Sequence, residues 1–134
     1  MKRLLLPLLL LAACTTSLSQ SRLGSKAYEV KSEFSAYKYK MFDGYDKDND
    51  YYVRVNLELG VVYYYFDENK VCNMTNIIPK SQSAINFYVE RYNKDYVPTS
   101  NTTWRMYSTD GIADIKLIYL KDGGCFFSWT TPTE

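Results

Sequence analysis

The densest cluster of groups that could do chemistry is acidic. Asp46, Asp48 and Asp50 recur at every second position, and clustered carboxylate oxygens are the ligands that Ca²⁺ prefers. An EF-hand loop starting at Asp46 would need Gly at its sixth position and Glu at its twelfth, where this chain has Tyr51 and Leu57. We therefore interpret the stretch as a solvated turn, with a loose, weak calcium site as the alternative, and the sequence predicts no metal and no cofactor.

Recognisable catalytic motifs are scarce in the rest of the chain. It contains no histidine, which removes the commonest general base, Ser–His and Cys–His nucleophile pairs and most zinc sites. The 15 acidic residues are scattered, and their spacing nominates no pair for acid–base catalysis; Asp114, in a predicted strand, could face either side. No glycine-rich phosphate loop or serine nucleophile motif is present. The sequence therefore predicts a non-enzyme, with a histidine-free hydrolase that uses carboxylates as the alternative.

Aromatic side chains are the remaining candidates for a binding surface. The chain has 14 Tyr, 6 Phe and 2 Trp among its 134 residues, a high share that favours strands. Because neighbouring side chains in a strand alternate, 51–52 and 63–65 place rings on both faces of a sheet. We expect a surface containing Tyr52, Arg54 and Tyr64 to bind a protein or a glycan. The alternative is that the rings only stabilise a small sheet through cross-strand pairs.

Alternation of apolar and polar residues predicts most of the secondary structure. The pattern over 28–41 indicates a strand with a bulge or a break near Ala36, and residues 53–59 alternate as a half-buried strand does. Further strands are expected over 61–66, 70–78, 103–107, 112–120 and 125–130. Asp-Gly turns at 110–111 and 122–124 connect the last three of these as hairpins.

One segment has the periodicity of a helix. Apolar residues over 85–96 recur at spacings of three and four, and Ser81 or Ser83 can cap its start. Strands before and after a single helix predict an α+β fold, namely a small antiparallel sheet of five to seven strands with the helix packed on one face. Trp104 and Trp129, in the late strands, are expected in the core.

The first 14 residues are typical of an export signal. Two basic residues precede the apolar run 4–13, which at about 1.5 Å rise per residue spans only half of a ~30 Å hydrocarbon core. The segment Leu11-Ala12-Ala13-Cys14 resembles the lipobox of bacterial lipoproteins, in which the cysteine is acylated and becomes the N-terminus. The resemblance implies lipid attachment at Cys14. Cleavage by an ordinary signal peptidase after Ser19 is the alternative.

These features divide the chain into a signal peptide (1–13), a polar tether (14–27) and one α+β domain (28–134). Cys72 and Cys125 then form an even pair in a compartment that oxidises thiols. Both lie in predicted strands, so we expect a disulfide between them, with two separate buried thiols as the alternative.

The sequence as a whole predicts a small, exported, lipid-anchored and non-catalytic domain of the bacterial cell envelope, or a secreted one. Its 16 basic and 15 acidic residues leave no basic surface for nucleic acid, and its only membrane contact would be the lipid. A purely structural or interaction component of the envelope is the second interpretation. Two glycosylation sequons, at 73–75 and 101–103, keep a eukaryotic secretory origin open.

Overall fold

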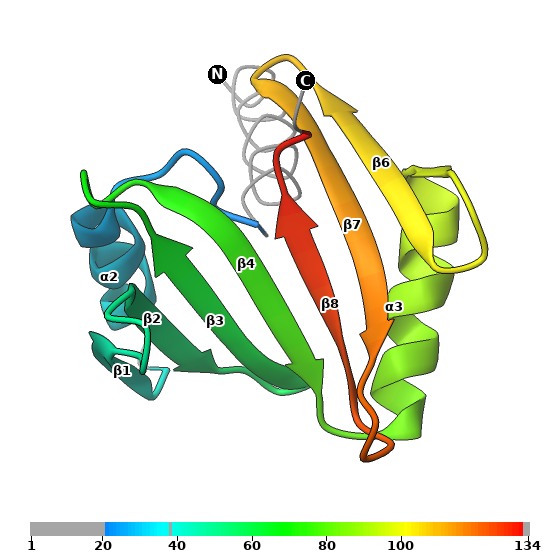
Figure 1. Ribbon diagram of the computed structural model, residues 1–134, viewed down its shortest axis with the longest axis horizontal. Coiled ribbons are helices and arrows are strands. Elements are labelled where there is room, and N and C mark those ends of the chain that lie inside the picture. The colour runs from blue at the N-terminus through cyan, green and yellow to red at the C-terminus, as the bar shows by residue number, and fades with distance from the viewer. Residues whose placement is uncertain (1–20, 38, 133–134) are drawn as a thin grey trace, which may run out of the picture.

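The computed structural model describes residues 21–37 and 39–132, which form an antiparallel sheet and two helices (Figure 1). The elements along the chain are α2 (Ala27–Ala36), β1 (Met41–Tyr45), β2 (Tyr51–Asn56), β3 (Gly60–Phe66), β4 (Cys72–Pro79), α3 (Gln82–Asp95), β5 (Val97–Pro98), β6 (Thr103–Ser108), β7 (Gly111–Tyr119) and β8 (Cys125–Thr130). The predicted α+β class is confirmed. Within the described residues the sheet has eight strands, however, and a second helix joins the predicted one.

The sheet has the strand order β1-β2-β3-β4-β8-β7-β6-β5, and each pairing between neighbours is antiparallel. Each helix is followed by four strands, and β4 pairs with β8 where the two halves meet. The chain therefore contains the same order of elements twice, once from α2 to β4 and once from α3 to β8. Among the described residues, neither helix has the length and apolar character that a bilayer crossing needs.

The helix α2 occupies part of the segment in which alternation predicted a strand, and that prediction is wrong. Ala27, Val30 and Phe34 are buried at spacings of three and four, which form one helical face. Val30 and Phe34 also fit a period of two, so the apolar pattern could not separate the alternatives. The Glu29 side chain accepts the Lys26 N–H at 3.0 Å and thereby satisfies one of the free donors at the helix start.

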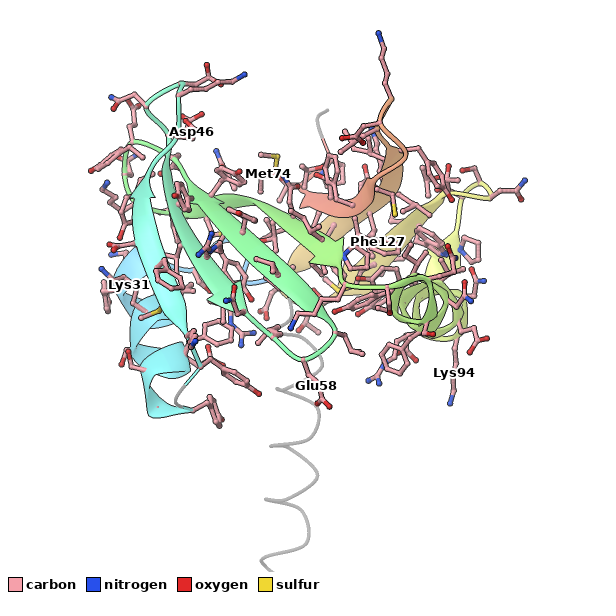
Figure 2. The ribbon with its side chains drawn as sticks, turned by 90° about the horizontal axis from the view of Figure 1, so that it is seen from below. Lys31, Asp46, Glu58, Met74, Lys94 and Phe127 are labelled. Atoms are coloured by element: carbon pink, nitrogen blue, oxygen red, sulfur yellow. The ribbon has the colours of Figure 1, made fainter. Side chains whose placement is uncertain are left out.

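The hydrophobic core lies between one face of the sheet and both helices. In the view of Figure 2 the helices lie on the same side of the sheet, and Met74 points away from them. Tyr92 of α3 is fully buried, with its ring centroid 5.5 Å from that of Trp104 and 5.6 Å from that of Trp129. The predicted α3 and the predicted burial of both tryptophans are confirmed, and Ser81 is the cap, accepting the Ala84 N–H at 3.1 Å.

The segment before α2 is packed on the sheet, although it was expected to belong to a tether reaching residue 27. The Gly24 N–H donates to the Cys72 carbonyl and the Cys72 N–H to the Ser25 carbonyl, both at 2.8 Å. Ser21 is buried, and its carbonyl accepts a hydrogen bond from the Thr75 hydroxyl. The folded region therefore begins no later than Ser21. The predicted signal peptide and Cys14 lie outside the described residues.

The predicted disulfide between Cys72 and Cys125 is not formed. Cys72 begins β4 and Cys125 begins β8, and the two strands are antiparallel neighbours in which Met74 pairs with Thr130. The first residues of antiparallel neighbours lie at opposite ends of the pair, which is too far apart for a bridge. Both thiols are free, one buried and one half-buried, and burial raises the pKa of each.

Candidate functional site

The face of the sheet opposite the helices is the candidate functional site, and we call it the open face. Neither of the two described helices lies on it (Figure 2). The first half of the sheet contributes these side chains to it: Phe42, Tyr52, Arg54, Tyr63, Tyr65 and Asn76. A sheet face that neither described helix covers, with this many large side chains, is typical of a surface that contacts another molecule.

Three tyrosines form a cluster on the open face. The register places Tyr52 opposite Tyr65, and the ring centroid of Tyr52 lies 5.7 Å from that of Tyr63 and 6.2 Å from that of Tyr65. The rings of Tyr63 and Tyr65 are 6.2 Å apart and nearly parallel, at 16°. All three side chains are partly exposed. Such cross-strand pairs stabilise the sheet, and they also fix the rings as a rigid surface.

A row of side chains crosses the strands beside this cluster. Phe42 pairs with Arg54, Arg54 with Tyr63, and Tyr63 with Asn76. The guanidinium of Arg54 lies 4.5 Å from the centre of the Phe42 ring, a favourable cation–π distance. Arg54 Nε and Asn76 Oδ1 are buried, and within the described residues neither has a hydrogen-bond partner. Buried polar atoms are nearly always hydrogen-bonded. These two atoms therefore retain hydrogen-bonding capacity that the row itself does not use.

The open face continues over the second half of the sheet. Asp114, whose side was undetermined from the sequence, points to this face and accepts two hydrogen bonds from Arg105, at 2.7 Å from Nε and 3.3 Å from Nη2. Tyr107 pairs with Ile112 at the end of the same strands, and they are 61% and 40% exposed. This half thus combines an ion pair with exposed apolar side chains, a mixture of polar and apolar groups that protein interfaces contain.

The structure divides the predicted binding residues between the two faces. Tyr52 and Arg54 lie on the open face, as expected, but Tyr64 is on the helix side, only 2% exposed. Its ring centroid is 5.7 Å from that of Phe34, and burial raises the pKa of its hydroxyl. Tyr63 and Tyr65 take its place on the open face. Alternation within the run 61–66 separates Tyr64 from Tyr63 and Tyr65. Only pairing with the neighbouring strands determines which of the two sets faces the helices.

The acidic stretch is a turn, as interpreted from the sequence. One carboxylate oxygen of Asp46 accepts the N–H groups of Asp48 and Asp50, each at 2.9 Å, so this carboxylate stabilises its own loop. The described part of the chain contains no cluster of three or more His, Cys, Asp or Glu residues with metal-binding geometry.

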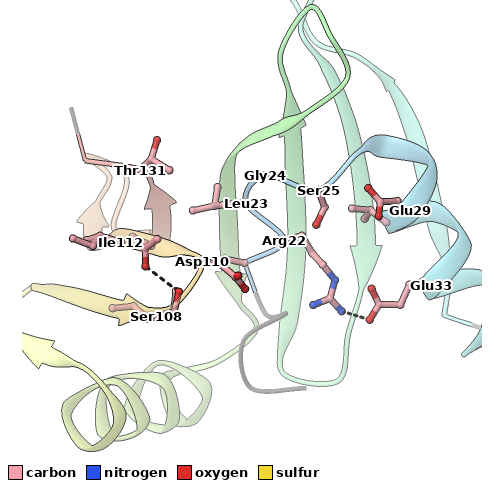
Figure 3. A pocket seen from close by; sticks show the side chains of 15 residues that line it. Arg22, Leu23, Gly24, Ser25, Glu29, Glu33, Ser108, Asp110, Ile112 and Thr131 are labelled. Carbon is pink, nitrogen blue, oxygen red and sulfur yellow. Dashed lines mark hydrogen bonds and ion pairs between the residues drawn. The ribbon is translucent and has the colours of Figure 1, made fainter. Parts of the chain in front are cut away.

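A cavity of about 500 Å³ on the helix side bears on the hydrolase alternative (Figure 3). Glu29, Glu33 and Asp110 line it, and the two glutamates are one helical turn apart. Glu33, however, pairs with Arg22 at 2.7 Å, and Glu29 accepts the Lys26 N–H. Both glutamates are therefore engaged in contacts with the segment before α2, and this cavity does not favour acid–base catalysis.

Comparison of the chain with protein-family models, with curated proteins and with solved structures finds no match.

Proposed function

We propose that the chain is an exported, lipid-anchored, non-catalytic binding domain whose open face contacts a protein partner. The observation that carries the proposal is the Tyr52–Tyr63–Tyr65 cluster beside Arg54 on a face that neither described helix covers. Tyrosine and arginine are enriched among the residues that dominate the binding energy of protein interfaces. The half-exposed rings are also held in place by one another, which lowers the entropy lost on binding.

A protein suits the open face better than a glycan or a small molecule. Small-molecule sites are concave, and three cavities of the described residues lie on the helix side. The rings of Tyr63 and Tyr65 stack on each other, so their flat faces are partly occupied and offer little area to a sugar ring. Apolar and charged side chains instead extend over both halves of the sheet, as a broad protein contact requires.

A lipid on Cys14 would keep the domain close to the membrane. From Cys14 to Ser21 the chain advances seven residues, which reach at most about 25 Å when extended. Ser21 is buried on the helix side of the sheet, where its carbonyl accepts the Thr75 hydroxyl. The connection therefore keeps Ser21 within about 25 Å of the bilayer surface.

Co-purification from the producing cells tests the protein contact. Tagged full-length chain is recovered in mild detergent as the wild type, as the double variant Tyr63→Ala/Tyr65→Ala, and as Tyr28→Ala, which removes a 68% exposed tyrosine from α2. We expect one protein to accompany the wild type and Tyr28→Ala and to fall at least tenfold with the double variant. Equal recovery with all three chains, or a glycan in place of the protein, would contradict the proposal.

Mass spectrometry of the purified chain tests the anchor separately. The proposal predicts an N-terminus at acylated Cys14. An unmodified N-terminus at Gln20 would contradict the lipid and keep export, and an intact Met1 would contradict both.

A further inference from the structure

A smaller cavity on the helix side has a composition unlike that of the open face. It has a volume of about 280 Å³ and lies between α2, α3 and the strands β3 and β4. Rings and aliphatic chains form most of its wall, among them Phe34, Tyr39, Val62, Tyr64, Ile77 and Tyr88. A concave, mainly apolar space with a few polar groups is the usual form of a small-molecule site.

Arg22 supplies the positive charge of this cavity and is held firmly in place. Its Nη2 donates to Glu33 at 2.7 Å (Figure 3), its guanidinium lies 5.2 Å from the centre of the Phe34 ring, and its side chain is only 11% exposed. The backbone beside it is tied to the sheet by the hydrogen bond from the Gly24 N–H to the Cys72 carbonyl. The guanidinium therefore stays at the cavity wall.

Two nitrogens of this guanidinium lack an acceptor. Nε and Nη1 of Arg22 are buried, and the described residues offer neither of them a hydrogen-bond partner. Buried donors without partners are rare, and they are costly when the group is charged. Glu33 occupies one nitrogen only, and a guanidinium has five N–H donors, so it can serve a second carboxylate. These nitrogens therefore retain the capacity to donate to an acceptor outside the described residues.

We propose that this cavity binds a small organic acid, whose apolar body packs among the rings and whose carboxylate accepts a hydrogen bond from Arg22 Nη1. Tyr64 and Tyr88 also line the cavity. Burial raises the pKa of both hydroxyls, so both remain protonated and uncharged at neutral pH. The site thus combines one cation with neutral rings, which suits an anion with an apolar body better than a sugar or a cation.

Binding of 4-phenylbutyrate to the full mature chain tests the proposal, with 4-phenylbutanol as the matched probe that lacks the carboxylate. Calorimetric titration measures affinity, and NMR reports the signals of Tyr64 and Tyr88. We expect the acid to bind at least tenfold more tightly than the alcohol and to shift both sets of signals. Arg22→Gln should lose at least tenfold in affinity for the acid, whereas Arg91→Gln, which alters an exposed arginine of α3, should lose none.

A second variant tests the proposal independently in case Arg22→Gln does not fold. Leu57→Trp adds bulk at the cavity wall and leaves Arg22 intact, so it should also reduce binding of the acid at least tenfold, with wild-type thermal unfolding as the check. Equal affinity for acid and alcohol, unchanged affinity in a folded Arg22→Gln, or absence of binding to the wild type would each overturn the proposal.

Discussion

Tyr64 and Tyr65 are consecutive residues of β3 that lie on opposite faces of the sheet. Tyr64 is 2% exposed and packs against Phe34 of α2, whereas Tyr65 is partly exposed and belongs to the open-face cluster. The alternation of side chains along a strand thus assigns one tyrosine to the core and its neighbour to the candidate interface. Stability and binding should therefore respond to different residues of one short segment.

The first prediction compares these two tyrosines. Tyr64→Ala should lower the free energy of unfolding by about 3–5 kcal/mol, as large-to-small changes of buried aromatic residues do. Tyr65→Ala should lower it by about 1 kcal/mol or less, because its ring already contacts water. Urea denaturation followed by circular dichroism measures both, and equal losses would show that the two faces are misassigned.

The second prediction concerns the buried side of α3. Val89 packs against the core, whereas the adjacent Glu90 is exposed. Val89→Asp should cost about 2–3 kcal/mol of stability because it places an unpaired charge in an apolar contact. Glu90→Ala should stay within about 0.5 kcal/mol of the wild type. Thermal unfolding of the two variants would contradict the helix orientation if Glu90→Ala proved the more damaging.

The third prediction is that Cys72 and Cys125 are both free thiols. A thiol-specific reagent should label Cys125 in the folded protein faster than Cys72, which is 2% exposed and whose pKa is raised mainly by burial. Unfolding without reductant should make both residues available. Failure to label either residue in the unfolded, unreduced chain would establish a bridge that the structure does not contain.

The fourth prediction is a loss of stability at alkaline pH. Burial raises the pKa of Tyr64, Tyr88, Tyr92 and Tyr96 above the ordinary value of 10.0. The unfolded chain releases these protons near pH 10 while the folded chain keeps them, so the stabilising contribution is present below pH 10 and is lost as pH rises above it. Tyrosinate absorbance and circular dichroism should therefore change together. Full ionisation of all 14 tyrosines near pH 10 with the fold intact would contradict this burial.

The sequence predicted elements whose apolar period is unambiguous. The stripe of α3 fits only a helix, and the Asp-Gly turns separate β6, β7 and β8 as expected. α2 was misassigned because Val30 and Phe34 fit both periods. β1 and β5 were missed because one lies at the edge of a polar turn and the other, Val97–Pro98, is only two residues long.

The candidate site could be predicted only in part, because its residues depend on register. The sequence indicates that Tyr63, Tyr64 and Tyr65 alternate, but the choice of the buried one depends on where α2 packs. The unpaired atoms of Arg22 and Arg54 leave no signal in the sequence, since each results from neighbours brought together by the fold. The separation of Cys72 and Cys125 likewise results from the strand order, which the sequence does not reveal.

Site-specific photo-crosslinking in the producing cells tests the protein-binding face most directly. A benzophenone amino acid replaces Tyr65 on the open face in one chain and the more exposed Tyr28 on α2 in the other. We expect a discrete adduct with one protein from position 65, none from position 28, and loss of the adduct when Arg54→Glu is added. Adduct formation from position 28 but not from position 65 would contradict the assignment of the open face as the interface.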